Sequence, residues 1–193
     1  MKPGPLIILS GPSGSGKTTV IERVLKTTDL PLHLSVSATT RATRPGEENG
    51  VHYYFWTPEQ FEREVRAGAF LEWAEVHGQR YGTLRQEVEP FRQKGAGVIL
   101  DIDVQGARAV RRQIPEAVLV FMRTSKFETY EQRLRQRATE DETRIQQRLA
   151  TARRELDQAH DYDFEVINDD LNVAVKSFHA IIRPLFERNE HAG

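Results

Sequence analysis

A glycine-rich segment near the start of the chain has the residue types that bind nucleotide phosphates. Residues 11–18 read Gly-Pro-Ser-Gly-Ser-Gly-Lys-Thr, which fits the pattern Gly, any four residues, Gly-Lys-Ser/Thr, and they follow an apolar run at residues 6–9. In a loop of this kind the backbone N–H groups surround phosphate oxygens, Lys17 reaches the β- and γ-phosphates, and the Thr18 hydroxyl ligates Mg²⁺. An amphipathic helix pattern follows at residues 19–26, and this order of strand, loop and helix favours phosphate binding over a plain Gly/Ser-rich turn. The predicted triphosphate-binding residues here are Gly11, Pro12, Ser13, Gly14, Ser15, Gly16, Lys17, Thr18 and Thr19.

A second candidate for the phosphate site is the apolar run at residues 98–102, which contains one aspartate and is followed by another. A buried strand that ends in a carboxylate has the pattern of the Walker B strand, which holds Mg²⁺ through water. We therefore predict that Asp101 lies on the metal side of the site. Asp103 has two interpretations that the sequence leaves open: it belongs to the phosphate site, or it is the N-cap of a helix that begins near Val104.

Two arginines, Arg41 and Arg44, lie in the hydroxyl-rich segment at residues 35–47, which ends with Pro, Gly and Glu. Planar guanidinium groups suit the oxygens of a phosphate monoester because they donate paired hydrogen bonds. Tyr53 and Tyr81 are further hydroxyl donors for the same anion. The alternative is that the arginines are exposed on a solvated loop and that the tyrosines belong to a small core.

The strongly charged segment at residues 125–154 contains a third cluster of arginines. On one continuous helix, four of them would fall within a sector of about 60°; these are Arg133, Arg137, Arg144 and Arg148. A cap signal at Thr139 predicts a break near Ala138, so we expect two helices joined by a turn, with the arginines folded into a clamp. Arginines placed in this way neutralise the charge of a transferring phosphoryl group. The alternative is a solvated helix face with ion pairs such as Glu140 with Arg144.

The elements that must position these residues follow an alternating pattern along the chain. Short apolar runs are separated by helical patterns, which predicts an α/β fold with a parallel sheet covered by helices. The predicted strands are residues 6–9, 34–36, 98–102, 118–121 and 164–167. Helix starts are predicted at residues 57–60, 125–128 and 139–142, and helix ends at Gly68 and Gly95. With the phosphate loop, this pattern predicts the P-loop NTPase fold, with insertions at residues 35–83 and 125–154.

Length and composition predict one compact domain with inserted subdomains. The 193 residues carry a net charge of −1, which gives no long-range field for nucleic acid, so any phosphate site must come from local clusters of Arg and Lys. The absence of cysteine excludes disulfides and thiolate metal sites, and the six histidines lack ligand spacing. No apolar signal segment or membrane-spanning run is present. We expect a cytoplasmic protein with no nucleic-acid, membrane or obligate protein partner.

Several motifs together give the chain a close resemblance to the guanylate kinase family of nucleoside monophosphate kinases. The resemblance covers nearly the whole chain. The motifs are the phosphate loop, residues 35–47, Gly-Val-His-Tyr-Tyr-Phe at 50–55, Phe-Leu-Glu-Trp-Ala-Glu-Val at 70–76, Tyr-Gly-Thr at 81–83, Asp-Ile-Asp-Val-Gln-Gly at 101–106 and Val-Ile-Asn-Asp-Asp at 166–170. The phosphate loop alone is shared with many NTPases, whereas residues 35–47 and 70–76 are specific to this family.

The resemblance implies a kinase that transfers the γ-phosphoryl group of Mg·ATP to GMP, giving ADP and GDP and so contributing to GTP supply. It implies that Arg41, Arg44, Tyr53 and Tyr81 hold the GMP phosphate, and that Ser37, Glu72, Thr83 and Asp103 face the guanine. It also assigns Arg137 and Arg148 to the ATP phosphates, and Arg133 and Asn168 to the adenine side. The implied layout is a core (1–34, 84–124, 155–193), a GMP-binding subdomain (35–83) and a lid (125–154).

The guanine assignment of Glu72 also has a physical basis. Guanine presents N1–H and N2–H₂ donors side by side, which one carboxylate accepts together, whereas adenine has an acceptor at N1. Thr83 has a second interpretation, because residues 83–86 also form a capping box before a helix ending at Gly95. Many relatives have Gly where this chain has Ala138, which bears on the flexibility of the lid.

Two alternative functions are distinguishable on sequence features. Guanylate-kinase-like domains also serve as inactive protein-binding modules, but these typically lack an intact phosphate loop, and here Gly16, Lys17 and Thr18 are all present. A kinase with another acceptor, such as a ribosyl phosphate or a different nucleotide, is the nearer alternative. Glu72, Thr83 and the arginine pair favour GMP.

Overall fold

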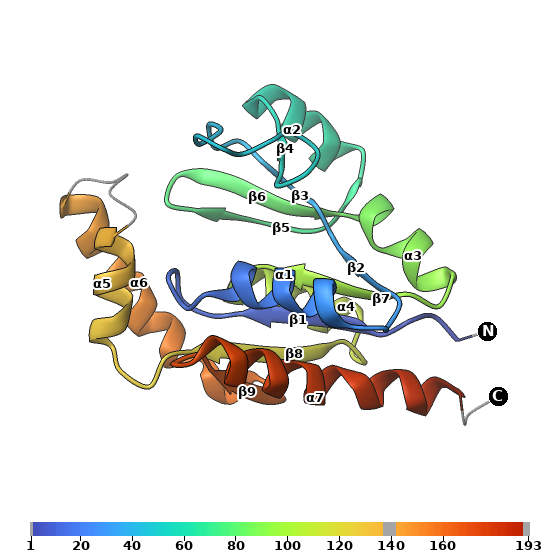
Figure 1. Ribbon diagram of the computed structural model, residues 1–193. Coiled ribbons are helices and arrows are strands. Elements are labelled where there is room, and N and C mark those ends of the chain that lie inside the picture. Colours follow the sequence, from blue (N-terminus) through green and yellow to red (C-terminus); the bar gives the residue numbers. More distant parts are fainter. Residues whose placement is uncertain (1, 137–141, 191–193) are drawn as a thin grey trace. The chain divides into compact units, whose positions relative to one another are not determined.

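The computed structural model of the chain describes residues 2–136 and 142–190, and Figure 1 shows its helices and strands. The chain divides into two compact units. The first unit comprises Met1–Leu6, Pro31–Leu100 and Gln105–Ala117; the second comprises Ile7–Leu30, Asp101–Val104 and Val118–Gly193. The domain boundaries inferred from the resemblance stay a prediction.

Three parallel strands form the centre of the second unit. They are β1 (Leu6–Ser10), β8 (Val118–Arg123) and β9 (Phe164–Ile167), and β8 pairs with both of the others. Every residue of β1 is buried, as expected of an interior parallel strand that is covered on both faces. The predictions of strands at residues 6–9, 118–121 and 164–167 are confirmed.

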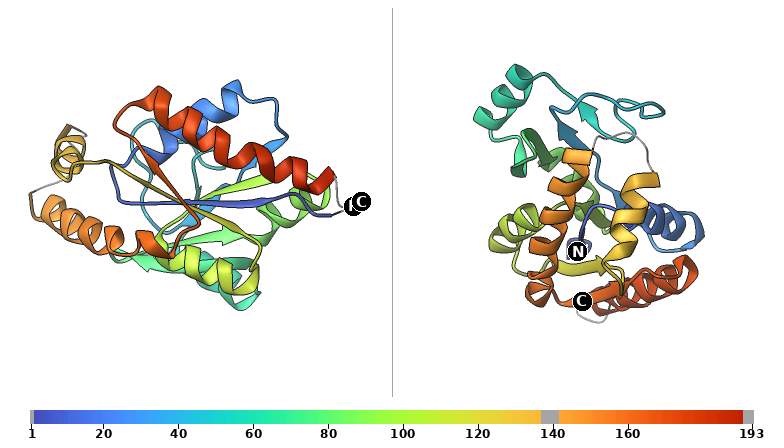
Figure 2. Two further views of the ribbon diagram at one scale, coloured as in Figure 1. Left: turned by 90° about the horizontal axis from the view of Figure 1, so that it is seen from below. Right: turned by 90° about the vertical axis from the view of Figure 1, so that its left-hand side faces the viewer.

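Four helices surround these strands in the second unit. They are α1 (Lys17–Thr27), α5 (Glu128–Gln136), α6 (Glu142–Leu156) and α7 (Leu171–Glu190). The α5 and α6 helices lie side by side (Figure 2, right) and share an apolar cluster of Tyr130, Leu134, Ile145 and Leu149. Among the described residues, Arg133 lies on α5, and Arg144 and Arg148 lie on α6, whereas the break predicted near Ala138 falls outside the described residues.

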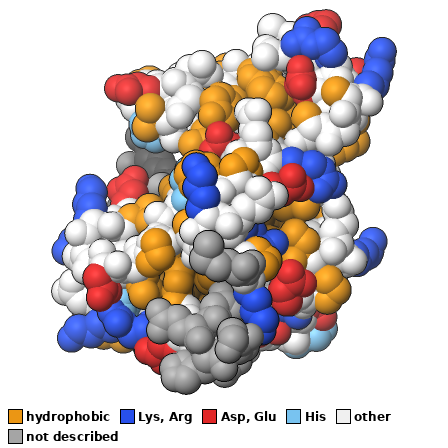
Figure 3. Space-filling view, turned by 90° about the vertical axis from the view of Figure 1, so that its right-hand side faces the viewer, with side chains coloured by type: hydrophobic (Ala, Val, Ile, Leu, Met, Phe, Trp, Pro, Cys, Tyr) orange, Lys and Arg blue, Asp and Glu red, His pale blue; other side chains and the backbone are white. Residues whose placement is uncertain are grey.

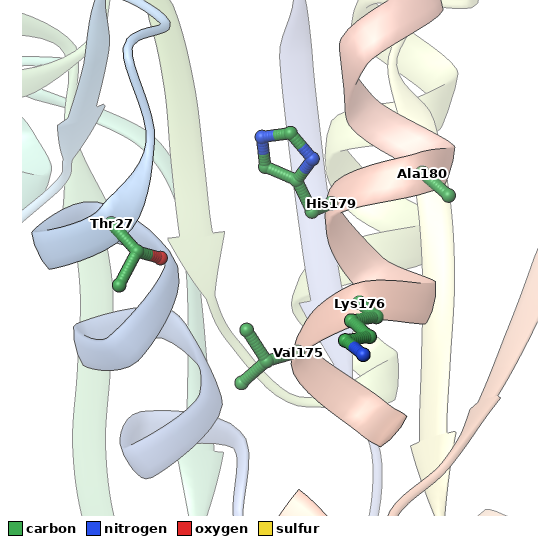
Figure 4. Close-up of a pocket in the computed structure, with 5 residues that line it drawn as sticks. All are labelled: Thr27, Val175, Lys176, His179 and Ala180. Carbon is green, nitrogen blue, oxygen red and sulfur yellow. The ribbon is translucent and has the colours of Figure 1, made fainter. Parts of the chain in front are cut away.

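The α1 and α7 helices pack against each other, and a shallow groove runs between them. Figure 4 shows its lining, which comprises Thr27 of α1 and Val175, Lys176, His179 and Ala180 of α7. At its edge, the Thr28 hydroxyl lies 3.2 Å from His179 Nε2. The groove is at the C-terminal end of α1, about 15 Å of helix away from the phosphate loop, so it is separate from the candidate nucleotide site.

The first unit contains a parallel strand pair and a separate four-stranded sheet. The pair is β2 (Leu32–Leu34) with β7 (Gly97–Asp101). The second sheet has the order β4-β3-β6-β5, with β3 (Ser37–Thr39), β4 (Tyr54–Phe55), β5 (Phe70–Val76) and β6 (Gln79–Leu84). The helices are α2 (Pro58–Arg66), the short α3 (Glu89–Gln93) and α4 (Val104–Gln113), and a 3₁₀ turn covers Arg85–Glu87.

The four-stranded sheet has two chemically different faces. One face packs against α2 through an apolar cluster of Ala38, Phe61, Phe70 and Leu84. The α2 helix begins as predicted: the Thr57 side chain accepts a hydrogen bond from the Gln60 N–H, and Pro58 is the first helical residue. Because side chains alternate along a strand, the opposite face carries the residues between these apolar positions, and it is polar.

Three sequence predictions need correction. Residues 34–36 are not one strand: β2 ends at Leu34 and β3 begins at Ser37, because the Val36 N–H turns to the Glu87 carboxylate. The helix predicted from Ser125 begins at Glu128, since the Ser125 N–H donates to Asp169 Oδ1 instead. Thr83 caps no helix in the structure, because its hydroxyl donates to Glu72.

One face of the described chain shows no large area of a single charge sign (Figure 3). On the face in Figure 3, Lys and Arg side chains are interspersed with Asp and Glu, which agrees with the net charge of −1. Within residues 2–136 and 142–190, no helix is long and apolar enough to cross a membrane. The same residues contain no group of three or more His, Asp or Glu side chains that could hold a metal ion.

Candidate active site

The glycine-rich segment forms a loop between β1 and α1, as its sequence predicts. The Ser15 N–H donates to the Pro12 carbonyl at 3.0 Å, and α1 begins at Lys17, directly after Gly16. The N–H groups of the first helical turn have no partner within the helix, and the helix dipole makes this end positive. The loop therefore has the backbone geometry and the electrostatic character of an anion site.

Gly16 is required at its position for two independent reasons. Its φ of 91° lies in the left-handed region, which side chains with a Cβ rarely adopt. A Cβ at this position would also lie 2.3 Å from Nδ2 of Asn168, which is far inside van der Waals contact. Thus the glycine lets the buried Asn168 amide approach the loop.

Asn168 and Arg133 hold the loop through its backbone carbonyls. The Asn168 amide donates to the Ser15 carbonyl at 2.7 Å, and Asn168 is only 4% exposed. Arg133 Nη1 donates to the carbonyls of Gly14 and Ser15, both at 3.2 Å, and its Nη2 donates to the Asn168 carbonyl at 3.0 Å. These contacts give both carbonyls hydrogen-bond donors and tie the loop to α5 and to Asn168. The assignment of both residues to the adenine side stays a prediction.

Side-chain contacts also hold Lys17, the first residue of α1, and Arg148 of α6 at the loop. Lys17 Nζ donates to the Gly11 carbonyl at 2.7 Å and lies 3.9 Å from Asp101 Oδ1. Arg148, on α6, donates from Nη2 to the Ser13 hydroxyl. The structure thus brings an α6 arginine to the loop, whereas Arg137 and Ala138 lie outside the described residues. The α6 backbone includes Arg144, whose side chain is not described.

Asp101 lies beside Lys17 and Thr18, the first two residues of α1. The Thr18 hydroxyl donates to Asp101 Oδ2 at 3.3 Å, and burial raises the pKa of the Asp101 carboxyl although Lys17 and Thr18 oppose the rise. Asp103 directly precedes α4, which begins at Val104, so its position fits the N-cap interpretation without deciding against the other. Asp103 belongs to the second unit.

Glu155, an α6 carboxylate, lies near Lys17 and Asp103, although no sequence pattern indicated it as a site residue. Burial raises the pKa of the Glu155 carboxyl; the Lys17 charge opposes this rise, and the Asp103 charge adds to it. Glu155 lies in a segment where charged residues are frequent, so its type gives no signal. Its place near Lys17 depends on how α6 packs, which no local pattern encodes.

In the first unit, Arg41 forms the centre of a cluster with Tyr53 and Tyr81. The Arg41 guanidinium lies 5.3 Å from the centre of the Tyr53 ring, and the rings of Tyr53 and Tyr81 are 6.1 Å apart with an edge-on orientation. The Arg41 side chain is 13% exposed. Arg41 is therefore largely buried, which is contrary to the exposed position considered for it as an alternative. Arg44 lies next to this cluster through its backbone N–H, which donates to Glu47.

A row of polar residues crosses the polar face of the four-stranded sheet. Ser37 on β3 pairs with Thr83 on β6, and Thr83 pairs with Glu72 on β5. The Glu72 carboxylate is 7% exposed, and its Oε1 accepts hydrogen bonds from the Thr83 N–H at 3.0 Å and the Thr83 hydroxyl at 2.6 Å. Tyr81 is two residues from Thr83 and lies on the same face. The structure thus joins Ser37, Thr83, Glu72 and Tyr81 in one surface.

Comparisons with known proteins agree with this geometry. Residues 4–185 match the guanylate kinase family. The chain belongs to the guanylate kinase family. It is 49% identical over 183 residues to the guanylate kinase of Rubrobacter xylanophilus, which covers 95% of each chain, and 48% identical over 179 residues to that of Symbiobacterium thermophilum, which covers 93% of this chain and 84% of the relative.

A solved structure extends the comparison to the fold. The crystal structure of guanylate kinase from Anaplasma phagocytophilum matches with a TM-score of 0.78 at 32% identity, covering 95% of this chain and 87% of the other. This confirms the predicted α/β fold with a parallel sheet and helices. As a member of the guanylate kinase family, the chain is an enzyme, an ATP:GMP phosphotransferase.

Proposed function

We propose that the polar face of the four-stranded sheet binds GMP and that the phosphate loop binds Mg·ATP. The observation that carries the acceptor assignment is the buried Glu72 carboxylate, which Thr83 holds in one orientation with two hydrogen bonds. A fixed carboxylate accepts the N1–H and N2–H₂ donors of guanine together, whereas N1 of adenine has no hydrogen to donate. Ser37, Thr83 and Asp103 complete the guanine-facing set, with Arg41, Arg44, Tyr53 and Tyr81 at the phosphate.

The donor assignment is supported by the geometry of the second unit. The loop N–H groups and the start of α1 attract the triphosphate, and Lys17 is tethered near it by the Gly11 carbonyl at 2.7 Å. Arg148 is held at Ser13, where its charge is available to the same phosphates. We assign residues 11–19 with Arg133, Arg137 and Asn168 to ATP.

The residues present fit a magnesium ion that arrives with the nucleotide. Thr18 Oγ1 and Asp101 Oδ2 are oxygen donors 3.3 Å apart at the end of the loop, and Mg²⁺ prefers oxygen ligands. Thr18 would ligate the ion directly and Asp101 through water. When bound, the ion would offset the negative charge of the nucleotide phosphates.

In the proposed mechanism, catalysis comes from positioning and from charge stabilisation by the protein. Phosphoryl transfer needs the attacking and leaving oxygens in line, and it needs positive charge around the moving group. Lys17, Arg41, Arg137 and Arg148 provide that charge, and no covalent intermediate is required. Residues 35–83 would act as the GMP-binding subdomain and residues 125–154 as the lid. A cytoplasmic location without an obligate protein partner is part of the same proposal.

The experiment that tests the acceptor assignment is the substitution Glu72→Gln. An amide offers guanine one acceptor and one donor, so the donor pair of the base is no longer matched. We expect kcat/KM for GMP to fall by about a hundredfold or more while the KM for ATP stays within about twofold. Steady-state kinetics with either nucleotide varied measures both constants.

The matched control for this substitution is Glu75→Gln. Glu75 is on the same strand, is exposed, and lies three residues along, which places it on the opposite face. It is expected to leave both KM values unchanged. An unchanged response to GMP in Glu72→Gln would show that the guanine-facing assignment is wrong.

A further inference from the structure

The Arg41 guanidinium is held by a carboxylate that the proposed site does not use. Glu47 accepts two parallel hydrogen bonds from Arg41: Nη2 donates to Oε1 at 2.8 Å and Nη1 donates to Oε2 at 2.9 Å. Nη1 also donates to the Ala42 carbonyl at 2.7 Å. This is the bidentate arrangement that fixes a guanidinium most strongly in direction as well as in distance.

The sequence Arg-Pro-Gly-Glu brings this carboxylate into place. Residues 44–47 form a turn in which the Glu47 N–H donates to the Arg44 carbonyl at 3.1 Å. Proline at the second position and glycine at the third, with φ of 85° at Gly46, are the signature of a type II turn. No atom lies within 4 Å of a Cβ built on Gly46, so only its backbone conformation requires glycine.

The same turn anchors the carboxylate at a second point. The Arg44 N–H donates to Glu47 Oε2 at 2.8 Å, so Oε2 receives one bond from each of the two arginines assigned to the GMP phosphate. The pair is well enclosed, since the side chains of Arg41 and Glu47 are 13% and 18% exposed. Burial raises the pKa of Glu47, but the bonds from Arg41 and Arg44 outweigh it and lower the pKa, so Glu47 is charged at neutral pH.

The contacts of Arg41 use a particular part of the side chain. An arginine has five N–H groups. The Glu47 and Ala42 contacts occupy both N–H groups of Nη1 and one of Nη2. The side edge, formed by Nε–H and the second Nη2–H, donates to none of the described residues, and it has the spacing of two oxygens of a phosphate. The rings of Tyr53 and Phe55, 5.3 and 5.6 Å from the guanidinium carbon, restrict its plane.

We infer that Glu47 is a positioning residue of the GMP phosphate site, which holds Arg41 by its terminal nitrogens and presents the edge formed by Nε and Nη2 to the phosphate. Glu47 does not occupy the place of the phosphate, because it takes the terminal pair of nitrogens and leaves the side edge. This inference rests on the proposed assignment of Arg41 to the phosphate. Gly46 contributes indirectly, because its left-handed backbone conformation forms the turn that carries Glu47.

The test compares Glu47→Ala and Glu47→Gln with Glu62→Gln as the control. Glu62 pairs with Arg80 at 2.8 Å in the same unit, but it is 40% exposed and lies on α2. We expect Glu47→Ala to raise the KM for GMP about tenfold, with the KM for ATP within about twofold, and Glu47→Gln to raise it less because its amide oxygen still accepts one bond. Glu62→Gln is expected to change neither constant.

Competitive inhibition by guanosine separates positioning from a structural role, because guanosine has the base but no phosphate. If Glu47 acts through Arg41, Glu47→Ala raises the KM for GMP about tenfold and leaves the inhibition constant of guanosine unchanged. Equal weakening of guanosine and GMP, or an unchanged KM for GMP, overturns the inference. Gly46→Ala should reproduce the loss for GMP, and Gly46→Asn should reproduce it less, since Asn tolerates the left-handed conformation.

Arg41→Ala distinguishes failure of this inference from failure of the proposed site. If Arg41→Ala leaves the KM for GMP unchanged, the assignment of Arg41 to the phosphate is wrong and the inference falls with it. If Arg41→Ala raises the KM for GMP and Glu47→Ala does not, only the role inferred for Glu47 is wrong.

Discussion

Three charged side chains of the candidate site are each held in place by hydrogen bonds to another group of the protein. Lys17 donates to the Gly11 carbonyl, Glu72 accepts twice from Thr83, and Arg41 is fixed by Glu47. Lys17, Glu72 and Arg41 each carry a charge that must lie at a defined position relative to the nucleotide. A charged side chain that is free to move loses rotamer freedom on binding, which has an entropy cost. Holding them beforehand reduces that cost.

At the residue scale we expect Lys17→Met to remove turnover while the protein stays folded. Methionine has a similar length but no charge, so the γ-phosphoryl group loses a cation in the transition state, and kcat should fall by about a hundredfold to a thousandfold. Steady-state assays with saturating ATP and GMP measure the loss, and thermal melting checks the fold. Lys26→Met, on the exposed last turn of the same helix, is the control. Normal turnover in Lys17→Met would contradict the donor assignment.

Residue types and spacing predicted the loop, Asp101, and the clustering of Arg41 with two tyrosines. They did not predict Glu155, because this carboxylate is brought near Lys17 by the packing of α6 rather than by local sequence. Glu47 is close to Arg41 in the chain, yet its role becomes visible only when the turn at Gly46 folds its carboxylate back.

At the scale of elements, the loop between β1 and α1 depends on two other elements of the second unit. Asn168 directly follows β9, and its N–H donates to the Arg123 carbonyl at the end of β8 at 2.7 Å. Arg133 comes from α5. The loop is therefore supported from the end of the sheet and from one helix of the charged segment.

We expect Asn168→Ala to weaken the binding of ATP and to leave the binding of GMP unchanged. The substitution removes the shorter of two hydrogen bonds to the Ser15 carbonyl and leaves only the 3.2 Å bond from Arg133, so the loop is held less firmly. The KM for ATP should rise about five- to tenfold, with the KM for GMP within about twofold. Asn172→Ala is the control, because Asn172 is four residues further along the chain, at the start of α7, and is exposed. Equal weakening of both nucleotides would point to a general loss of fold instead.

Sequence periodicity predicted the strands at residues 6–9, 118–121 and 164–167, but it predicted none of the four strands of the second sheet, which lie within residues 37–84. The strands of the parallel sheet were visible because buried strands are continuous apolar runs. The segment at residues 34–36 was misread because β2 and β3 are both short and only two residues apart. Ser125 has the type of an N-cap, but Asp169, which is distant in the chain, takes its N–H.

At the scale of the whole molecule, the residues assigned to the two nucleotides belong mainly to different compact units. The phosphate loop and its arginines are in the second unit, and Arg41, Glu72 and Tyr81 are in the first. Family membership came from motifs spread over nearly the full length, and the match over residues 4–185 agrees with that extent. A phosphate loop alone would have predicted only a nucleotide-binding protein.

The central claim is that this chain transfers a phosphoryl group from ATP to GMP and to no other common nucleoside monophosphate at a comparable rate. The most direct measurement is ADP release from Mg·ATP with GMP, AMP, CMP or UMP as the acceptor, each at the same concentration. We expect rapid turnover with GMP and turnover at least about a hundredfold slower with each of the others, because only guanine presents paired donors to Glu72. Turnover with none of the four, or faster turnover with another acceptor than with GMP, would contradict the account.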